Sequence, residues 1–394
     1  MQPNDKIQQL TAEAADLLKG MVAIKSPSFS EEDVCTYICN WLSGKGIVHK
    51  RIGNNITARL SEQKGIPMKG FQDKPVLMLC AHIDTVSPSE DYSFDPYVPD
   101  YEKAAECINR KISNGEIPES PKPMIAADDI VAGLGSNDDG ASVVSMLAAF
   151  RYFMQSPVMD ILLVLTCEEE RSGLNGMTGL WGTVLNGKDA DSILVNYAVV
   201  GEPTLMKAAT SERGLLVIDA TAHGVSGHAA RNEGVNAIEV ALKDISALKE
   251  HVFEKISPRM GKVNLNVTQI NAGTAHNVIP DICTFVIDIR PTEQYTNEEI
   301  LDELQKICAS QLKARNLSNR SSAAAEDSPL QRAAESLGIE TFSSPTTSDW
   351  MRINCDAIKM GPGNSSRSHK KDEFVFISEI EQGITTYIDF IKSL

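Results

Sequence analysis

Residues 158–173 read VMDILLVLTCEEERSG, and the rest of the chain is organised around this stretch. The apolar run over residues 161–165 has the length of a strand and suits the middle of a parallel sheet covered on both faces. It stops at three consecutive glutamates, Glu168, Glu169 and Glu170. Open α/β sheets bind ligands at the carboxyl ends of their strands, so the triplet marks a site there. Taken alone, a glutamate triplet is also typical of a solvated acidic loop.

Other predicted strands end in a similar way, which favours the site over the loop. Strand 76–81 leads into His82 and Asp84, strand 193–201 into Glu202, and strand 357–360 into Gly361, Gly363 and then His369. A further acidic pair, Asp138 and Asp139, lies in a Gly-rich turn before the apolar helix predicted at 141–150. Imidazole and carboxylate ligands without cysteine favour zinc, or alternatively manganese or cobalt. Five or more donors exceed what one tetrahedral ion needs, which suggests two metals that share a carboxylate.

Composition limits the partners and the compartment. The net charge of −16 argues against nucleic acid or an anionic membrane as a partner. The eight cysteines form no CxxC pair, so the simplest interpretation is a reduced, cytoplasmic protein. The N-terminus has no basic segment followed by an apolar one, and no run approaches 18 apolar residues. We therefore expect neither a signal peptide nor a membrane span.

A change of pattern after Glu202 predicts a second domain inside the first. Strands at 214–222, 263–271, 284–290 and 316–323 alternate with helices at 236–248 and 298–312, a β-α-β-β-α-β order typical of ferredoxin-like domains. The predicted fold is therefore α/β: a doubly wound, mostly parallel sheet over residues 1–212 and 323–394, with an inserted ferredoxin-like α+β domain over 213–322. The polar excursion at 101–127, helical over 103–112, receives no chemical role.

Six motifs in order carry a resemblance to a known family. They are His82-Ile-Asp84-Thr-Val, Gly135-Ser-Asn-Asp138-Asp-Gly, Glu168-Glu-Glu170, Gly201-Glu202-Pro-Thr, Gly227-His228-Ala and Gly361-Pro-Gly…Ser368-His369. From about residue 10 to the C-terminus the chain resembles the di-zinc metallopeptidase family of acetylornithine deacetylase, succinyl-diaminopimelate desuccinylase, aminoacylase and carboxypeptidase G. Within that family it looks most similar to the acetylornithine deacetylase-like enzymes of Bacteroidetes, through stretches such as GHAARNEGVNAI and GPGNSSRSH.

The resemblance implies the ligands of two zinc ions, for which cobalt or manganese could substitute. His82, Asp138 and Glu202 would hold one ion. Asp138, Glu170 and His369 would hold the other, so Asp138 would bridge the pair. Asp138 is preferred to Asp139 because of its spacing from the preceding glycine.

Two acidic residues beside these ligands are expected to assist them. Asp84, two residues past His82, fits a carboxylate that fixes the tautomer of the imidazole, although an aspartate there could also simply cap a loop. Glu169 points away from Glu170 by strand-end alternation and is the expected general base. Glu168 is expected only to support the loop.

The resemblance also implies residues that bind the substrate. His228, which sequence alone would leave as a surface residue, resembles the family histidine that stabilises the tetrahedral oxyanion, often in the active site of a partner subunit. Arg290 resembles the arginine that grips the substrate carboxylate, and Asn277 would touch the same group. Gly361 and Gly363 suit a loop whose backbone approaches the ligand. A homodimer through the inserted domain follows from the role of His228.

Three functions remain open at this point. The first is hydrolysis of the amide bond of an N-acyl amino acid, with N-acetyl- or N-succinyl-L-ornithine in arginine biosynthesis preferred. The second is a di-zinc aminopeptidase or dipeptidase, or a succinyl-diaminopimelate desuccinylase. The third is a two-metal phosphoesterase or an inert metal-binding module, against which Glu169 and the absence of a cationic phosphate loop both argue. A succinyl group would require one more cation, and Arg213, Arg231 and Arg367 are the choices.

Overall fold

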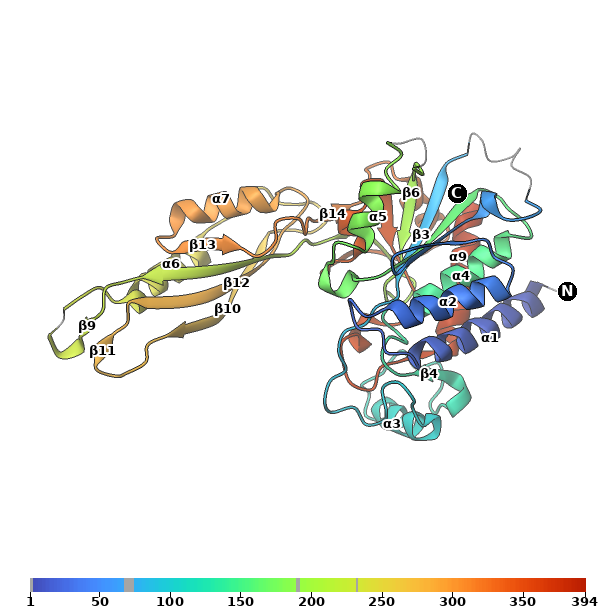
Figure 1. Cartoon of the computed structure of the whole chain (residues 1–394), viewed down its shortest axis with the longest axis horizontal. Helices are drawn as coiled ribbons and strands as arrows, with labels where there is room; N and C mark the ends of the chain where they lie inside the picture. Colours follow the sequence, from blue (N-terminus) through green and yellow to red (C-terminus); the bar gives the residue numbers. More distant parts are fainter. Residues whose placement is uncertain (1–2, 67–73, 189–191, 232) are drawn as a thin grey trace. The chain divides into compact units, whose positions relative to one another are not determined.

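The chain forms two compact units. The computed structural model describes residues 3–66, 74–188, 192–231 and 233–394. The first unit comprises Met1–Thr210, Ala324–Phe342 and Ser348–Leu394, and the second comprises Ser211–Ala323 and Ser343–Thr347 (Figure 1). One continuous segment therefore leaves the first unit, builds most of the second and returns.

A nine-stranded sheet in the described residues has the order β1-β2-β5-β3-β6-β16-β7-β14, with β15 also beside β7. Its strands are β1 (Lys50–Ile52), β2 (Asn55–Arg59), β3 (Val76–His82), β5 (Asp160–Thr166), β6 (Tyr197–Val200), β7 (Ala208–Glu212), β14 (Ser322–Ala323), β15 (Thr341–Ser344) and β16 (Asp356–Lys359). The central strands β5, β3, β6 and β16 run parallel, whereas β2 and β7 join them antiparallel. The carboxyl ends of the four central strands therefore lie at one edge, where such sheets bind ligands.

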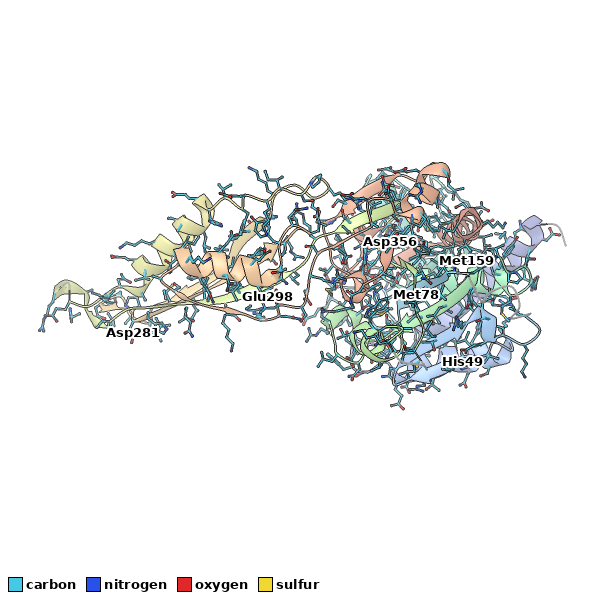
Figure 2. All side chains as sticks on the ribbon, turned by 90° about the horizontal axis from the view of Figure 1, so that it is seen from above. His49, Met78, Met159, Asp281, Glu298 and Asp356 are labelled. Atoms are coloured by element: carbon cyan, nitrogen blue, oxygen red, sulfur yellow. The ribbon has the colours of Figure 1, made fainter. Side chains whose placement is uncertain are left out.

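Helices cover this sheet and complete the main core. They are α1 (Pro3–Val22), α2 (Glu32–Gly44), α4 (Gly140–Phe153), α5 (Met177–Thr183), α8 (Pro329–Ser336) and α9 (Ile377–Ser393). Helices α1, α4 and α9 pack against one another, and α4 also packs against β3 and β5. Every residue of β3 and β5 is buried, including Met78, because both faces of these strands are covered (Figure 2).

The excursion over residues 101–127 builds a separate small core. Helix α3 (Tyr101–Ser113) begins at Asp100, whose side chain accepts hydrogen bonds from the backbone N–H groups of Glu102 and Lys103. Its apolar face packs with the antiparallel pair β4 (Ile130–Ala132) and β17 (Phe374–Phe376) around Ile108, Phe374 and Phe376. The excursion is therefore a folded element of the first unit.

The second unit has the β-α-β-β-α-β order that the sequence predicts. Its elements are β8 (Leu216–His223), α6 (Ala237–Glu250), β10 (Asn264–Ala272), β12 (Ile282–Arg290), α7 (Asn297–Ile307) and β13 (Gln311–Ala314), with a short pair formed by β9 (Gly227–His228) and β11 (Val278–Ile279). The sheet is antiparallel throughout, in the order β10-β12-β8-β13. The mostly parallel α/β sheet with an inserted α+β domain is thus the fold that the sequence indicated.

The end of this unit differs from the prediction. The helix predicted at 298–312 stops at Ile307, and the strand predicted at 316–323 is instead Gln311–Ala314. The buried carboxylate of Asp244 accepts hydrogen bonds from the backbone N–H groups of Ala309 and Ser310, at 2.9 and 2.8 Å, and so ends the helix. Periodicity alone could not reveal this, because Leu312 continues the apolar spacing of the helix while belonging to a strand.

None of the helices that the structure describes is both long enough and apolar enough to cross a membrane.

Candidate metal centre

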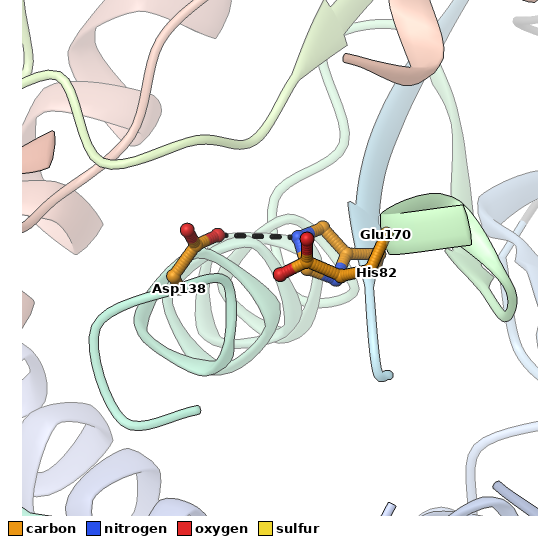
Figure 3. Close-up of side chains that lie close together, drawn as sticks. All are labelled: His82, Asp138 and Glu170. Atoms are coloured by element: carbon orange, nitrogen blue, oxygen red, sulfur yellow. Dashed lines mark hydrogen bonds and ion pairs between the residues drawn. The ribbon is translucent and has the colours of Figure 1, made fainter. Parts of the chain in front are cut away.

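Three predicted ligands from distant parts of the chain meet at the carboxyl edge of the sheet (Figure 3). His82 ends β3, Asp138 lies in the turn before α4, and Glu170 lies in the short 3-10 turn η4 (Glu169–Arg171) after β5. His82 Nε2 lies 3.3 Å from Asp138 Oδ1. One ligand atom from each of the three residues lies within 4.8 Å of the others. This spacing is short enough for a single ion to bind all three.

Asp84 holds both His82 and the glutamate turn. His82 Nδ1 lies 3.0 Å from the backbone carbonyl of Asp84 and 3.5 Å from its carboxylate. A proton on Nδ1 leaves the Nε2 lone pair directed toward Asp138. The same carboxylate accepts hydrogen bonds from the backbone N–H groups of Glu169 and Glu170, at 3.0 and 3.1 Å, and from the hydroxyl of Ser28 at 2.6 Å. One buried aspartate therefore sets the positions of the imidazole and of the two glutamates.

Glu169 and Glu202 form a second group with His82. Ligand atoms of these three residues also lie within 4.8 Å of one another. Burial, followed by the charge of Asp349, holds the pKa of Glu169 well above its ordinary value. Burial, followed by the charge of Asp138, does the same to the pKa of Glu202. Carboxylates gathered so closely keep protons unless a cation balances their charge.

His369 completes the cluster from the C-terminal side. Its Nε2 lies 3.0 Å from the carboxylate of Glu170 and 3.7 Å from Asp138 Oδ2. The hydrogen bond with Glu170 raises the pKa of His369 to about 9. His369 therefore lies beside Glu170 and Asp138, whereas Glu202 lies with His82 and Glu169 and is close enough to Asp138 for its charge to act on it.

The side chains of this cluster do not satisfy one another's charge and hydrogen bonds, and bound divalent ions would do so. Burial lowers the pKa of His82, but hydrogen bonds with Asp138 and Asp84 outweigh this effect and hold it well above its ordinary value. Burial also raises the pKa of Asp139 to about 8, and its Oδ1 has no hydrogen-bond partner within the described part of the chain. A buried set of histidine and carboxylate side chains with ligand atoms this close together is a candidate site for a divalent metal ion. The predicted partition into two ligand sets stays a prediction.

Two further carboxylates support this cluster, and sequence reasoning did not single them out. Glu373 Oε1 accepts hydrogen bonds from the backbone N–H groups of Asn137 and Asp138, both at 2.9 Å. Asp349 Oδ2 accepts one from the hydroxyl of Thr166 at 2.6 Å, and burial raises the pKa of Asp349 to about 6. In the sequence, Glu373 is distinguished only by its position four residues after the predicted ligand His369, and no pattern pointed to Asp349.

Glu168 has a different task from its two neighbours. Its carboxylate accepts hydrogen bonds from the backbone N–H and the side-chain amide of Asn175, at 3.0 and 2.7 Å. Its own N–H donates to the buried carboxylate of Glu31 at 3.1 Å. These contacts close the loop after β5 and direct Glu168 away from the ligands.

The glycines at the end of β16 pack tightly against the ligand loops. A Cβ at Gly361 would lie 2.5 Å from the carbonyl oxygen of Glu202. Gly363 has a φ of +82°, and a Cβ there would lie 2.4 Å from the side chain of Asn137. Larger residues at either position would therefore displace the loops that carry Glu202 and Asp138. Their predicted contact with a ligand stays a prediction.

The remaining predicted residues lie in the second unit, at two different ends of it. His228 pairs with Val278 in the β9–β11 pair, and the N–H of Ala229 donates to the carbonyl of Asn277 at 3.0 Å. His228 is exposed, and its Nδ1 accepts a hydrogen bond from Ala230 at 3.2 Å, which leaves Nε2 as the donor of the neutral ring. Arg290 lies at the far end of β12 and forms a paired contact with Asp288, at 2.9 and 3.2 Å.

Comparison with known proteins agrees with this architecture. A family profile described as a peptidase dimerisation domain matches residues 210–316, and one described as peptidase family M28 matches residues 55–197. A peptidase M20 domain-containing protein of Schizosaccharomyces pombe is 26% identical, over 94% of this chain and 82% of that protein. The acetylornithine deacetylase of Proteus mirabilis is 24% identical, over 89% of this chain and 87% of its own.

A solved structure shares the whole fold. The aminopeptidase PepT of Bacillus cereus superposes with a TM-score of 0.70 at 16% identity, over 97% of this chain and 98% of its own. The two profiles match parts of both units, and the relatives cover most of the chain. The chain is therefore similar over most of its length to proteins of the M20 peptidase family, and its residues 210–316 match a peptidase dimerisation domain.

Proposed function

We propose that this chain is a two-metal amidohydrolase that cleaves the amide bond of an N-acyl amino acid, with N-acetyl- or N-succinyl-L-ornithine in arginine biosynthesis as the preferred substrate. One observation carries the proposal. His82, Asp138, Glu169, Glu170 and Glu202 converge at the carboxyl edge of the central strands, where burial and neighbouring carboxylates hold the pKa values of Glu169 and Glu202 well above their ordinary values. The resemblance to the Bacteroidetes deacetylase-like enzymes and a cytoplasmic location remain predictions from sequence.

The same residues divide into two ligand sets around Asp138. His82, Asp138 and Glu202 would hold one ion, and Asp138, Glu170 and His369 the other. Zinc suits this mixture of imidazole and carboxylate, and cobalt or manganese could substitute. When bound, two divalent ions would polarise the amide carbonyl and lower the pKa of a water molecule.

Glu169 is the proposed general base. Its carboxyl group lies close to His82 and Glu202. In this proposal Glu170, and not Glu169, is the metal ligand. Glu169 would take a proton from the attacking water as the new C–O bond forms, and would deliver this proton to the amine as the C–N bond breaks. Asp84 assists by fixing the backbone of Glu169, at 3.0 Å from its N–H.

The second unit supplies substrate contacts in a way that favours a dimer. Val278 of β11 pairs with His228 before β12 begins, and Arg290 is the last residue of β12, so the whole strand separates the two (Figure 1). At about 3.4 Å per residue, the nine residues of β12 span roughly 27 Å. His228 and Arg290 of one chain are therefore too far apart to contact the same small substrate. We propose that each substrate meets Arg290 of one chain and the partner subunit's His228 and Asn277.

The choice between an acetyl and a succinyl group depends on one more cation. Arg213 donates to the carbonyl oxygens of Met260, Lys262 and Arg290. Arg367 is engaged by Glu119 and Glu379. Of the three arginines considered, Arg231 is exposed and remains the choice for a second substrate carboxylate.

A peptidase acting on small peptides, or a succinyl-diaminopimelate desuccinylase, is the second proposal. The fold is shared with the aminopeptidase PepT of Bacillus cereus, and the same ligands and base would serve both reactions. Motifs alone do not separate these substrates.

A direct assay tests the proposed reaction. The protein is stripped of metal, reloaded with zinc, cobalt or manganese, and incubated with N-acetyl-ornithine, N-succinyl-ornithine, N-succinyl-diaminopimelate and a dipeptide. We expect release of ornithine in the metal-loaded protein only. Release from the dipeptide alone would support the peptidase, and hydrolysis of none of the four by any metal form would contradict both proposals.

A further inference from the structure

The excursion over residues 101–127 borders the loop that carries His369. Helix α3 packs against β4, which pairs with β17 directly after this loop. A cavity of about 360 Å³ lies between the two segments, lined by residues of both, including Glu116, Glu119 and Arg367. The polar side chains around it are therefore placed to act on the histidine loop.

Glu119 ties the start of the loop. Its Oε1 accepts hydrogen bonds from the side-chain amide of Asn364 at 2.9 Å and from Arg367 Nη2 at 2.8 Å. Arg367 is buried, and its guanidinium group also contacts both carboxylate oxygens of Glu379 and the ring of Phe374. A single carboxylate of the excursion thus holds two residues of the loop at once.

Asn364 also connects the loop to the turn that carries the predicted ligand Asp138. Its backbone N–H donates to Asn137 Oδ1 at 3.0 Å, and its carbonyl accepts from Asn137 Nδ2 at 3.1 Å. Asn137 directly precedes Asp138. The upstream end of the histidine loop is therefore fastened both to the excursion and to the turn that carries the proposed bridging ligand.

Asp372 ties the other end of the loop to the same part of the chain. Its carboxylate accepts hydrogen bonds from the backbone N–H of Ser93 at 2.6 Å and pairs with Lys111 of α3 at 3.0 Å. His369 and Asp372 have φ angles of +57° and +59°. Residues with a Cβ adopt this left-handed conformation only where the surrounding contacts impose it. Contacts on both sides of His369 include Glu119, Lys111 and Ser93, so this part of the chain helps to impose the conformation.

We propose that the excursion braces the histidine loop, with Glu119 as a positioning residue that holds His369 ready for the second metal ion. This inference rests on the proposed two-metal centre. It gives a role to a segment that the family resemblance leaves without one. Glu119 itself acts through Asn364 and Arg367 and touches neither substrate nor metal.

The test measures metal binding. Wild-type protein, Glu119→Ala and Glu119→Gln are stripped of metal and titrated with Co²⁺ against a competing chelator, which gives a dissociation constant for each ion. Glu116→Ala is the matched control, because Glu116 lines the same cavity, is exposed, and its carboxylate accepts a described hydrogen bond only from the side chain of Asn114. Hydrogen exchange of residues 364–373 is followed in the metal-free proteins.

We expect Glu119→Ala to raise the dissociation constant of one of the two ions, the one that His369 would hold, about ten-fold to a hundred-fold, as loss of a residue that supports a ligand does elsewhere. The other ion should bind as in wild type, Glu119→Gln should recover part of the loss, and exchange in 364–373 should accelerate. Unchanged binding of both ions, or an equal loss at both sites with a lower unfolding temperature, would overturn the brace. Failure of the wild-type protein itself to bind two ions would instead contradict the proposed two-metal centre.

Discussion

At the scale of single residues, three consecutive glutamates of the site make different contacts. Glu168, Glu169 and Glu170 are chemically identical, yet Glu168 binds Asn175, Glu170 faces His369, and Glu169 faces His82 and Glu202. The backbone separates them, because Glu168 has a φ of +60° and Asp84 holds the two following N–H groups. A local conformation therefore assigns the three roles.

Replacement of the proposed base tests this assignment. Glu169→Gln keeps the size of the side chain but removes the group that accepts the proton. We expect both ions to bind and turnover to fall by about 10²- to 10⁴-fold, the usual contribution of a general base. Metal content by atomic absorption and turnover of the preferred substrate are measured together, with Glu168→Gln as the neighbouring comparison. Full activity in Glu169→Gln would remove the assignment.

The carboxylate cluster also predicts how the metal-free protein responds to pH. Burial raises the pKa of Asp139 to about 8, and the hydrogen bond with Glu170 raises the pKa of His369 to about 9. Burial holds the pKa values of Glu169 and Glu202 above their ordinary range as well. All four groups bind protons more tightly in the folded than in the unfolded chain between about pH 5 and 8. Stability should therefore fall as the pH rises through this window.

The measurement is the unfolding temperature of the metal-free protein from pH 5 to pH 8, with zinc-loaded protein alongside. Asp84 and Asp138 have lowered pKa values. Their contribution to the stability of the fold is therefore lost only as the pH falls below about 4, and it does not oppose this trend. Zinc replaces the protons, so the loaded protein should lose less stability and release protons on binding. An unfolding temperature that rises with pH in the metal-free protein would contradict the charge balance described for the cluster.

At the scale of elements, ends of helices and strands are set by contacts that lie far away in the sequence. Helix α7 stops at Ile307 although the apolar spacing runs on to Leu312. The carboxylate of Asp244, on helix α6, accepts hydrogen bonds from the N–H groups of Ala309 and Ser310. The chain then leaves the helix and enters β13. The boundary is thus a tertiary feature of the second unit.

Removal of that carboxylate should destabilise the second unit. Asp244→Ala removes the buried acceptor of the N–H groups of Ala309, which is exposed, and of Ser310, which is buried, and we expect a loss of about 3 kcal/mol in the free energy of unfolding. Asp302→Ala, at an exposed position on α7, should change it by less than about 0.5 kcal/mol. Urea unfolding of the two variants gives both values. Equal stabilities would show that Asp244 does not fix the end of α7.

At the scale of the whole molecule, the proposed activity needs two chains. His228 and Arg290 lie at opposite ends of the sheet in the second unit, and the first unit holds the cluster of ligands. A dimer would let the second unit of each chain serve two active sites, one through Arg290 and one through His228. Light scattering should accordingly show a homodimer.

Mixing of two inactive variants tests whether His228 acts on the partner. His228→Ala lacks the oxyanion donor, and Glu169→Gln lacks the base. In a mixed dimer, one site combines an intact metal cluster with the partner subunit's His228. We expect dimers re-formed from the two variants to regain up to about a quarter of wild-type activity, because half of them are mixed and each has one intact site. No recovery after proven subunit exchange would place His228 in the active site of its own chain.

Much of the fold could be predicted from local sequence. The apolar runs that become β3 and β5 have strand length and no polar face, so they predict the centre of a covered parallel sheet. The polar residues directly after the central strands predict a shared edge, and the structure brings His82, Asp138 and Glu170 together there. These features follow from sequence because side-chain periodicity and the direction of parallel strands are local rules.

Only the tertiary structure decided which residues support that edge and what the excursion does. Asp349 and Glu373 become neighbours of the ligands through folding, across more than 180 and 230 residues respectively. The excursion reads as a polar surface segment, yet Glu119 and Lys111 meet the histidine loop across some 250 residues. Sequence patterns record which faces of an element are apolar, whereas a buried hydrogen bond between distant carboxylates and amides leaves no such period. That His82, Asp138 and Glu170 gather at this edge could therefore be predicted from the chain, and the contacts that hold them in place could not.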